Sequence, residues 1–449
     1  MPQTIKLKKG LDIHLQGKPE NVKLSVSPDG KYALIPDGFE GITPKVVVKE
    51  GDKVKAGDFL FVDKKHPEMG FSAPVSGVVH EILRGERRKV LNVSLKADEQ
   101  IVYKDFGKVD VNTADGSLIK HKLIEAGLFG YITQLPYAIT TTPDAKPKSI
   151  FISAIRDMPL ATDFEFELND NEEAFQTGIT ALSKIAPVFL GIGKNTKSNT
   201  LRNAKDATIT FFEGPCPAGN VGVHVNHIDP INKGEIVWTI DPTAVIFFGR
   251  LFLTGKVDLR RIIGIAGANA TKTGFAEVII GQSISSILAG KYDENSNSRI
   301  INGNPLTGKI SSKNDYLLPH TSEITIIPEG DKNDEFLGWI LPRTNQLSAS
   351  RSYFSWLMPK KTFNLDTRIK GGERHMIMSG EYDRVIPMDI YAEYLIKAII
   401  AEDIDKMEQL GIYEVSPEDF AVAEFVDSSK LELQYIVRNG LNKLRKENS

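Results

Sequence analysis

The sequence contains a single cysteine, Cys216, among its 449 residues. One thiol cannot form an internal disulfide, a Cys-based zinc site or a Cys-ligated iron–sulfur cluster, which needs four thiolates. A charge excess is also missing, because Lys plus Arg total 55 and Asp plus Glu total 58, a formal net charge of −3. Nucleic-acid binders need a basic excess to displace counterions, so we expect no nucleic-acid partner.

Long apolar runs are absent as well. The most apolar stretch, residues 244–253, contains Arg250 and is far shorter than the roughly 20 apolar residues that cross a bilayer. No apolar segment follows the basic residues near the N-terminus, so we expect no signal peptide. The sequence therefore predicts a chain that is soluble by itself and can still dock on a membrane complex.

The length indicates about three domains at roughly 150 residues each. The first 100 residues contain short apolar runs separated by Gly and Pro, which favours a small sandwich or barrel. After Asn112, apolar strands at 149–153, 187–191 and 207–212 alternate with helical patterns such as 172–185, which predicts an open α/β sheet.

The remainder divides into two parts. A smaller α+β unit has expected strands at 261–266, 275–280 and 299–302 and a helix at 282–289. Beyond it, an apolar stripe that includes Met388, Tyr391 and Leu395 indicates a helix, and Ser416 before Pro417 indicates another helix start. We therefore expect a multidomain α/β and β protein, divided into residues 1–35 (N-terminal arm and strands), 36–105, 106–255, 256–330 and 331–449 (linker and helical C-terminal domain).

Two motifs could form a phosphate-binding or metal-binding site, but each also has a purely structural interpretation. Residues 191–196 follow a strand but lack the glycine spacing of both the dinucleotide fingerprint and the P-loop, so we interpret them as a turn. His224, His227 and Asp229 are potential metal ligands. The two histidines would point to opposite faces of a strand, and Gly222 and Pro230 disfavour a helix. We therefore expect a loop with a locally hydrogen-bonded histidine pair, no metal site and no identifiable catalytic residue.

The segment 214–222 has two prolines and three glycines directly after an apolar strand. Ligands of open α/β sheets lie beyond the carboxyl ends of the strands, so the segment is either a ligand or subunit contact loop or a rigid connector. Cys216 within it lacks a nearby base other than His224, which argues against a nucleophile.

The N-terminal segment alternates apolar and basic residues. Ile5, Lys6, Lys8 and Lys9 could form an edge strand of the first domain, or an arm that contacts a membrane partner or anionic headgroups. Both interpretations stay open at the level of sequence.

Segments 48–60 and 72–78 resemble the barrel-sandwich hybrid of biotinyl and lipoyl domains. The position of the carrier lysine in those domains corresponds here to His66, and the carrier hairpin pattern is absent. The resemblance implies the scaffold without its swinging arm.

A second resemblance runs through most of the chain. Segments 9–13, 212–219, 224–230, 237–240, 335–340 and 380–390 resemble, in the same order, the NqrA family of the sodium-translocating NADH:quinone oxidoreductases. This resemblance implies a barrel-sandwich hybrid, a Rossmann-like open α/β sheet, a β-grasp module of the soluble-ligand-binding (SLBB) type that includes 300–308, and a helical C-terminal domain.

The resemblance also implies a function. Such a chain is a peripheral subunit on the cytoplasmic face of the bacterial inner membrane, in a complex that couples electron transfer from NADH to quinone with Na⁺ export. FAD, FMN, riboflavin and a 2Fe-2S cluster belong to other subunits, the partners are the subunits designated B to F, above all the B subunit, and ubiquinone is a candidate ligand. The isolated chain is expected to be non-catalytic. The candidate quinone or subunit contacts are Phe212, Gly214, Pro215, Pro217, Gly219, His224, His227 and Asp229, and the candidate docking arm is Ile5, Lys6, Lys8 and Lys9.

Two other functions remain open from the sequence. The chain could be a stand-alone cytosolic protein that binds a ligand through its β-grasp module. It could also be a C-type subunit of a related electron-transport complex that has lost its clusters.

Overall fold

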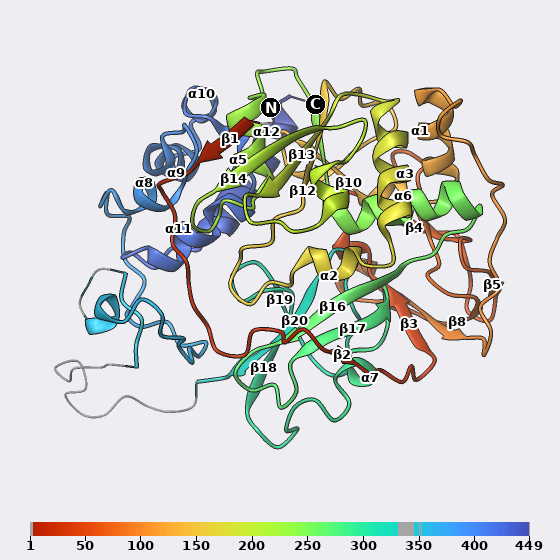
Figure 1. Ribbon diagram of the computed structural model, residues 1–449, viewed down its shortest axis with the longest axis horizontal. Helices are drawn as coiled ribbons and strands as arrows, with labels where there is room; N and C mark the ends of the chain where they lie inside the picture. Colours follow the sequence, from red (N-terminus) through yellow and green to blue (C-terminus); the bar gives the residue numbers. More distant parts are fainter. Residues whose placement is uncertain (1–2, 331–344, 350, 352, 449) are drawn as a thin grey trace.

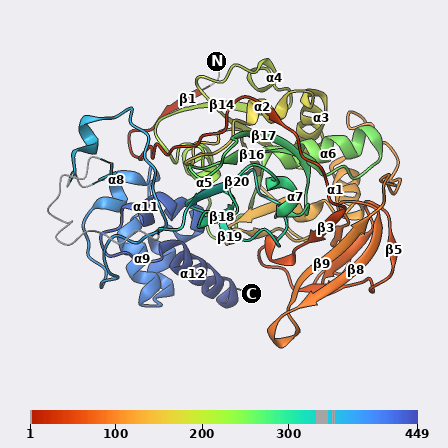
Figure 2. The same cartoon turned by 90° about the horizontal axis from the view of Figure 1, so that it is seen from below.

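A computed structural model describes residues 3–330, 345–349, 351 and 353–448. The segment 335–340, which contributes to the family resemblance, lies outside the described residues. Figures 1 and 2 show an α/β core with a small all-β unit on one side and the C-terminal helices on the other. The expected architecture, with a barrel-sandwich hybrid, an open α/β sheet, a β-grasp module and a helical region, is confirmed.

The all-β unit consists of two antiparallel sheets with an aromatic centre. Phe61 and Phe71 stack at 4.8 Å between ring centroids, and Phe39 contacts both rings. His66 lies in the connection between β6 and β7, where its Nδ1 atom is 3.7 Å from a carboxylate oxygen of Asp144. The strand orders are β3-β9-β8-β5 and β4-β6-β7. The strands are β3 (Lys31–Leu34), β4 (Pro44–Val46), β5 (Lys53–Val54), β6 (Phe59–Asp63), β7 (Gly70–Ser72), β8 (Gly77–Arg84) and β9 (Val90–Ala97), with 3₁₀ helices at Pro36–Gly38 and Glu86–Arg88.

The central sheet has the order β1-β14-β13-β12-β15-β10-β11. Strands β12, β13, β14 and β15 are parallel, and their spatial order in chain numbering is 3-2-1-4. This is the order of a doubly wound sheet, whose topological switch point lies between the first and the fourth strand, here β12 and β15. The strands are β10 (Ile132–Leu135), β11 (Ile139–Thr140), β12 (Ser149–Ser153), β13 (Val188–Gly193), β14 (Thr208–Glu213) and β15 (Val237–Ile240).

The N-terminal segment joins this central sheet. Strand β1 (Gln3–Lys6) pairs in parallel with β14, with Ile5 opposite Phe212. The alternative that this segment is an edge strand of the first domain is therefore wrong. The backbone of β1 forms the outer edge of the sheet, while Lys6, Lys8 and Lys9 are exposed.

Helices α3 and α6 pack closely against each other. An added Cβ atom at Gly249 of α6 would lie 1.7 Å from the carbonyl oxygen of Ala174 in α3. Helix α6 is almost entirely buried, which explains why the apolar stretch 244–253 has no polar face. None of the helices within the described ranges is long and apolar enough to span a bilayer. The helices of this unit are α1 (Gly116–Glu125), α2 (Phe164–Leu168), α3 (Glu172–Ser183), α4 (Asn199–Arg202), α5 (Val221–Ile228) and α6 (Pro242–Thr254), with a 3₁₀ helix at Phe129–Tyr131.

The β-grasp unit has a six-stranded sheet in the order β19-β18-β20-β16-β17-β2. The expected pairing of 261–266 with 275–280 is present as the antiparallel pair β16 and β17. Strand β2, from the N-terminal segment, completes the edge beside β17. The elements are β2 (Lys23–Leu24), β16 (Arg260–Ala266), β17 (Gly274–Ile279), α7 (Ile284–Leu288), β18 (Ser298–Asn302), β19 (Lys309–Ser311) and β20 (Glu323–Pro328).

The C-terminal helices form a separate core that also includes Leu7 and Phe212. Helices α9 and α12 cross where Ile399 contacts Gly440. The predicted apolar stripe is wrong at Tyr391, which precedes α9 and is exposed. The elements are α8 (Glu381–Val385), α9 (Ala392–Ile400), α10 (Ile404–Gln409), α11 (Ala421–Val426) and α12 (Leu433–Glu447), with 3₁₀ helices at Phe354–Leu357, Ile412–Glu414 and Pro417–Phe420.

The close contact of α3 and α6 gives a test of the packing. Gly249→Ala should lower the free energy of unfolding by about 3 kcal/mol, because the methyl group would overlap the Ala174 carbonyl and force the helices apart. The measurement is the urea midpoint. Gly372→Ala is the control: no atom lies within 4 Å of an added Cβ there, so its midpoint should match that of the unchanged chain. Equal midpoints for both variants would contradict the packing.

Candidate functional site

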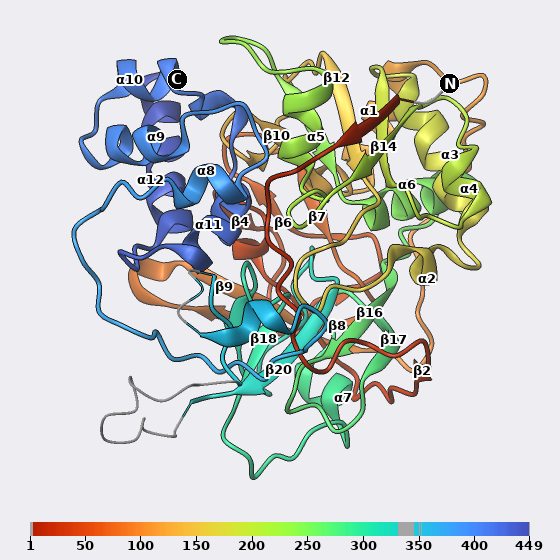
Figure 3. The ribbon, with the colours of Figure 1, turned by 60° about the vertical axis from the view of Figure 1, so that its left-hand side comes forward.

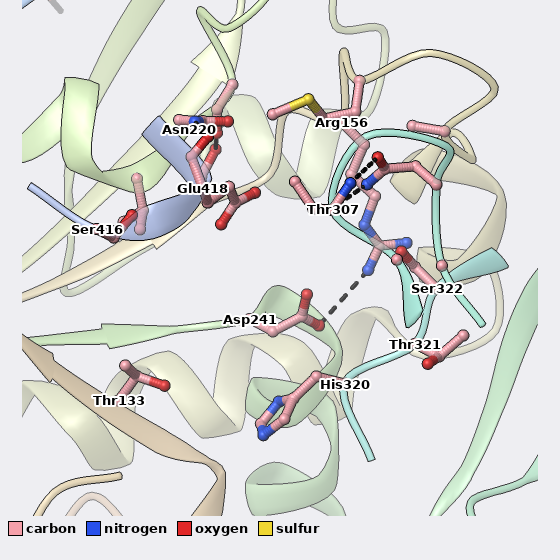
Figure 4. A pocket seen from close by; sticks show the side chains of 18 of the residues that line it. Thr133, Arg156, Asn220, Asp241, Thr307, His320, Thr321, Ser322, Ser416 and Glu418 are labelled. Atoms are coloured by element: carbon pink, nitrogen blue, oxygen red, sulfur yellow. Dashed lines mark hydrogen bonds and ion pairs between the residues drawn. The ribbon is translucent and has the colours of Figure 1, made fainter. Parts of the chain in front are cut away.

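A cavity of about 590 Å³ lies at the switch point of the central sheet. Its walls come from the segments that follow β12 and β15, from the β-grasp unit and from the C-terminal helices (Figure 4). This is the position at which open α/β sheets bind their ligands, and the volume suits a small organic molecule. Polar and charged groups on the walls include Thr133, Ser153, Arg156, Asp157, Asn220, Asp241, Asn304, Thr307, His320, Ser322, Glu323, Ser416, Glu418 and Arg438.

Arg156, which follows β12, is buried in a network of ion pairs and hydrogen bonds. It donates to the carboxylate of Glu167 in α2 at 3.1 Å and to the hydroxyl of Thr243 in α6 at 2.9 Å. Its guanidinium also lies 3.5 Å from Asp241, the residue that caps α6 by accepting from the Thr243 backbone N–H. Arg261 of β16 reaches the same network through Thr243. The network connects the central sheet to the β-grasp unit beneath the cavity.

Carboxyl groups dominate the side of the cavity nearest the C-terminal helices. Burial raises the pKa of Asp157 to about 6, although its carboxylate accepts from the Gly219 backbone N–H at 2.8 Å. Desolvation by the surrounding protein, together with the nearby charges of Asp419 and Asp157, raises the pKa of Glu418 to about 7, although the residue is exposed. The Glu418 side chain still meets the open space of the cavity, so a ligand could reach it.

The pKa values of Asp241 and His320 are both lowered, which favours the charged form of Asp241 and the neutral form of His320. Burial works to raise the pKa of Asp241, but the charges of Arg156 and Arg261 outweigh it and hold that pKa below its usual range. Desolvation by the surrounding walls lowers the pKa of His320 to about 4, which favours the neutral imidazole near pH 7, although the residue is exposed. Its ring packs edge-on against Phe39 and Tyr131. In Figure 4, His320 and Glu418 lie on opposite sides of the cavity, with Asp241 between them.

The cavity is poorly suited to phosphate groups. Dinucleotide-binding sheets place a glycine-rich loop after the first strand, whereas here residues 154–158 read Ala-Ile-Arg-Asp-Met. The guanidinium of Arg156 is already paired with carboxylates, Lys309 and Arg438 donate to backbone carbonyls, and Asp157, Asp241 and Glu418 would repel an anion. The arrangement instead suits an uncharged ligand that exchanges hydrogen bonds with the carboxyl, imidazole and hydroxyl groups.

The predicted contact loop, 214–222, reaches the cavity at Gly219, Asn220 and Val221, and of the individually predicted contact residues Gly219 alone lines it. Gly219 lines the cavity, and its backbone N–H is bonded to Asp157. Phe212 lies behind the wall, where its ring stacks on His224 at 3.8 Å. Pro217 is buried beside Cys216, whose pKa is raised by burial and by neighbouring carboxylates, as expected for an unreactive thiol.

The outer part of the loop contacts the N-terminal arm. An added Cβ atom at Gly214 would lie 2.7 Å from Leu7, and one at Gly10 would lie 2.7 Å from the Pro215 ring. Ile5 of the arm is half-buried. The arm and the loop, which are far apart in sequence, therefore share one side of the molecule, where β1 runs beside β14 (Figure 3).

The predicted loop geometry for the two histidines is wrong, because both lie on helix α5. His224 is buried and donates from Nε2 to the Ala218 carbonyl at 2.9 Å, and burial lowers its pKa to about 4. His227 contacts the Val223 carbonyl through Nδ1 at 2.9 Å. Asp229 pairs with Lys148 at 2.8 Å, so the three side chains do not converge. Within the described ranges, no group of three or more His, Cys, Asp or Glu residues could hold a metal ion.

Sequence reasoning missed the residues that dominate the cavity. Arg156, Asp241, His320 and Glu418 come from four separate segments and match no local motif. The only available signal was positional, since Arg156 and Asp241 directly follow two predicted strands of an open sheet.

Removal of the central guanidinium tests the network. Arg156→Met should lower the free energy of unfolding by about 3–5 kcal/mol, because Glu167 and Asp241 would stay buried without their partner. Urea denaturation at neutral pH measures the change. Arg84→Met removes an exposed arginine and should change stability by less than about 0.5 kcal/mol. The double variant Arg156→Met/Glu167→Gln should recover part of the loss, and a stable single variant would contradict the network.

Comparisons with known proteins agree along the whole chain. Three family models match: the NqrA N-terminal barrel-sandwich hybrid domain at 5–98, the NqrA second alpha/beta domain at 114–257 and the NQRA C-terminal domain at 262–313. The A subunit of the Na(+)-translocating NADH-quinone reductase from Haemophilus influenzae (strain PittGG) is 35% identical over 99% of this chain and 100% of its own length. The protein of that name from Yersinia pestis bv. Antiqua (strain Angola) is 33% identical over the same shares.

Among solved structures, an NAD⁺-reducing [NiFe]-hydrogenase in the H2-reduced state is 10% identical, with a TM-score of 0.38 over 75% of this chain and 64% of the other, and this low likeness supports no conclusion. The three family models and the full-length relatives settle the assignment: the chain belongs to the NqrA family, the A subunits of the Na⁺-translocating NADH-quinone reductase.

Proposed function

We propose that this chain is a peripheral subunit, without a redox cofactor of its own, that binds the head group of a quinone in its central cavity. Ubiquinone is the candidate ligand. Electron transfer from NADH and Na⁺ export take place in the other subunits, designated B to F, which carry FAD, FMN, riboflavin and the 2Fe-2S cluster. The chain docks on them at the cytoplasmic face of the bacterial inner membrane, with the B subunit as the main partner, and does not catalyse the reaction in isolation.

The observation that carries the quinone proposal is the cavity at the sheet's switch point, which is lined by carboxyl, imidazole and hydroxyl groups and has no glycine-rich loop after its first strand. A quinone head group is uncharged and presents carbonyl oxygens that accept hydrogen bonds. Protonated Glu418 and neutral His320 supply donors from opposite sides, and Leu135, Ile155 and Met158 add apolar wall.

Glu418 makes quinone binding dependent on pH. Its pKa of about 7 means that it loses its proton as pH rises through neutrality. The charged form cannot donate to a carbonyl oxygen, so affinity should fall above pH 7. We expect Glu418→Gln, whose amide donates at every pH, to bind with little pH dependence, and Glu418→Ala to bind about tenfold more weakly at pH 6.

The test is titration of the purified chain with a water-soluble quinone analogue between pH 6 and about 8.5. Glu447→Gln, an exposed glutamate near the C-terminus, is the matched control and should retain the pH dependence of the unchanged chain. A flat titration of both the isolated chain and the assembled complex would remove the quinone proposal. If Glu418→Gln binds the quinone analogue with the same pH dependence as the unchanged chain, Glu418 is not the group that makes binding depend on pH.

The N-terminal arm is proposed to assist docking. Lys6, Lys8 and Lys9 point to solvent from the edge of the central sheet, so replacing them should leave the fold intact. We expect the triple variant Lys6→Gln/Lys8→Gln/Lys9→Gln to rebind less well to membranes that have been stripped of this chain. The readout is the fraction of the chain that sediments with the membranes.

The matched control for the arm is Lys49→Gln/Lys53→Gln/Lys55→Gln, which removes three exposed lysines from the barrel-sandwich hybrid. Rebinding of this control should equal that of the unchanged chain. Equal losses in the two triple variants would indicate a general charge effect and would exclude a specific docking role for the arm.

A further inference from the structure

Residues 351 and 353–380, which we name the basic strip, differ in charge from the rest of the chain. The strip has six Lys and Arg and two Asp and Glu, so its formal charge is 6 − 2 = +4. The whole chain has a formal charge of −3, which leaves −3 − 4 = −7 for all other residues. A positive segment on an otherwise acidic protein is attracted to an anionic surface.

Large apolar side chains are exposed on the same strip. The 3₁₀ helix Phe354–Leu357 turns three of its four side chains outward: Phe354 is 50% exposed, Trp356 52% and Leu357 59%. Exposed apolar side chains of this size in a short cluster mark an interaction site. Trp and Phe are also the residues that settle at the boundary between water and a bilayer.

Hydrogen bonds from the strip connect it to three parts of the protein. The buried Phe363 bonds through its backbone N–H to the carbonyl of His14 in the N-terminal segment, at 2.8 Å. The Thr367 hydroxyl donates to the carbonyl of Glu329 at the end of the β-grasp unit, at 2.7 Å. The Arg374 backbone N–H donates to the carbonyl of Ser429 among the C-terminal helices, at 2.8 Å. The strip therefore runs along the outside of the molecule between these units, at the side visible in Figure 3.

We propose that the basic strip rests on the anionic lipid surface of the membrane, with Phe354, Trp356 and Leu357 inserted at the headgroup level and Lys360 and Arg374 facing the lipid phosphates. The proposal rests on the peripheral position argued above and names the surface that meets the bilayer. The charge of the strip favours a membrane over a protein as its partner. Lysine is depleted from protein–protein interfaces, whereas basic residues beside exposed aromatic residues are typical of proteins that lie on anionic membranes.

The experiment is co-sedimentation of the purified full-length chain with vesicles of phosphatidylcholine, alone or mixed with phosphatidylglycerol. We expect binding to the mixed vesicles at low salt, none to phosphatidylcholine alone, and release at high salt. Lys360→Gln/Arg374→Gln should weaken binding by roughly 30-fold, since each basic residue near an anionic surface contributes about fivefold. Trp356→Ser/Leu357→Ser should also weaken it and should make the remaining binding fully salt-sensitive.

Two control variants separate the strip from other exposed groups. Tyr391→Ser/Tyr394→Ser removes two exposed aromatic residues beside and within α9, outside the strip, and should bind the vesicles normally. The arm variant Lys6→Gln/Lys8→Gln/Lys9→Gln should retain most of the vesicle binding. Urea midpoints equal to that of the unchanged chain confirm that each variant is folded.

Three results would overturn the proposal. One is the absence of binding to anionic vesicles, and another is equal binding by the strip variants and the unchanged chain. The third is a strip variant that binds vesicles normally but no longer assembles with the detergent-solubilised membrane subunits, because the strip would then contact a protein. Loss of self-association in gel filtration by such a variant would likewise indicate that the strip contacts a second copy of this chain. The quinone titration and the assembly assay, run on the same variants, show whether the proposed function itself has failed.

Discussion

The buried guanidinium of Arg156 is the constraint on which the arrangement of this protein depends. Arginine does not lose its proton in a protein, so burying it requires carboxylates or other acceptors around it. Those acceptors come from α2, from the cap of α6 and from the side chain of Thr243, which also accepts from Arg261 of the β-grasp unit. Helices α2 and α6 and strand β16 are thereby fixed relative to β12. The network that joins them forms the floor of the cavity.

The same network explains why the cavity is acidic. Arg156 pairs with Glu167 and Asp241 below the cavity, whereas Asp157 and Glu418 have no ion pair within the described ranges. Burial then favours the protonated form of both groups. A glycine-rich loop at this position would favour phosphate binding, whereas Arg156, already paired with carboxylates, disfavours it. Under the proposed function, the ligand position of a doubly wound sheet is retained and is used for an uncharged ligand.

Much of the fold could be predicted from the sequence because buried parallel strands are short, nearly continuous apolar runs. The runs at 149–153, 187–191 and 207–212 correspond to β12, β13 and β14. The failures have local causes. Helix α5 forms even though Gly222 lies within it, because burial of Val223 and Val225 outweighs the low helix propensity of glycine. Tyr391 shares the apolar period but precedes the first turn of α9 and remains exposed.

The candidate site was much less predictable, because its groups converge only after folding. Arg156 and Glu418 are separated by 418 − 156 = 262 positions, and neither belongs to a recognisable motif. The contact loop was predicted because its prolines and glycines are concentrated in one segment, yet Gly214 and Pro215 pack against the N-terminal arm, and Gly222 packs against Asp419. Local composition identifies where a backbone is constrained, whereas a cavity depends on which distant side chains are left without partners.

The distribution of charge connects the cavity with the outer surface. The interior carboxyl groups disfavour anions and suit an uncharged ligand, while the basic strip is attracted to anions and stands outside the cavity. A quinone is uncharged and partitions into the bilayer, so a protein that takes one from the membrane benefits from both properties at once. An excess of basic over acidic residues around the cavity would draw phosphates and nucleotides into it, and an acidic excess on the outer strip would repel the membrane. Keeping the two signs on separate parts of the chain avoids both conflicts.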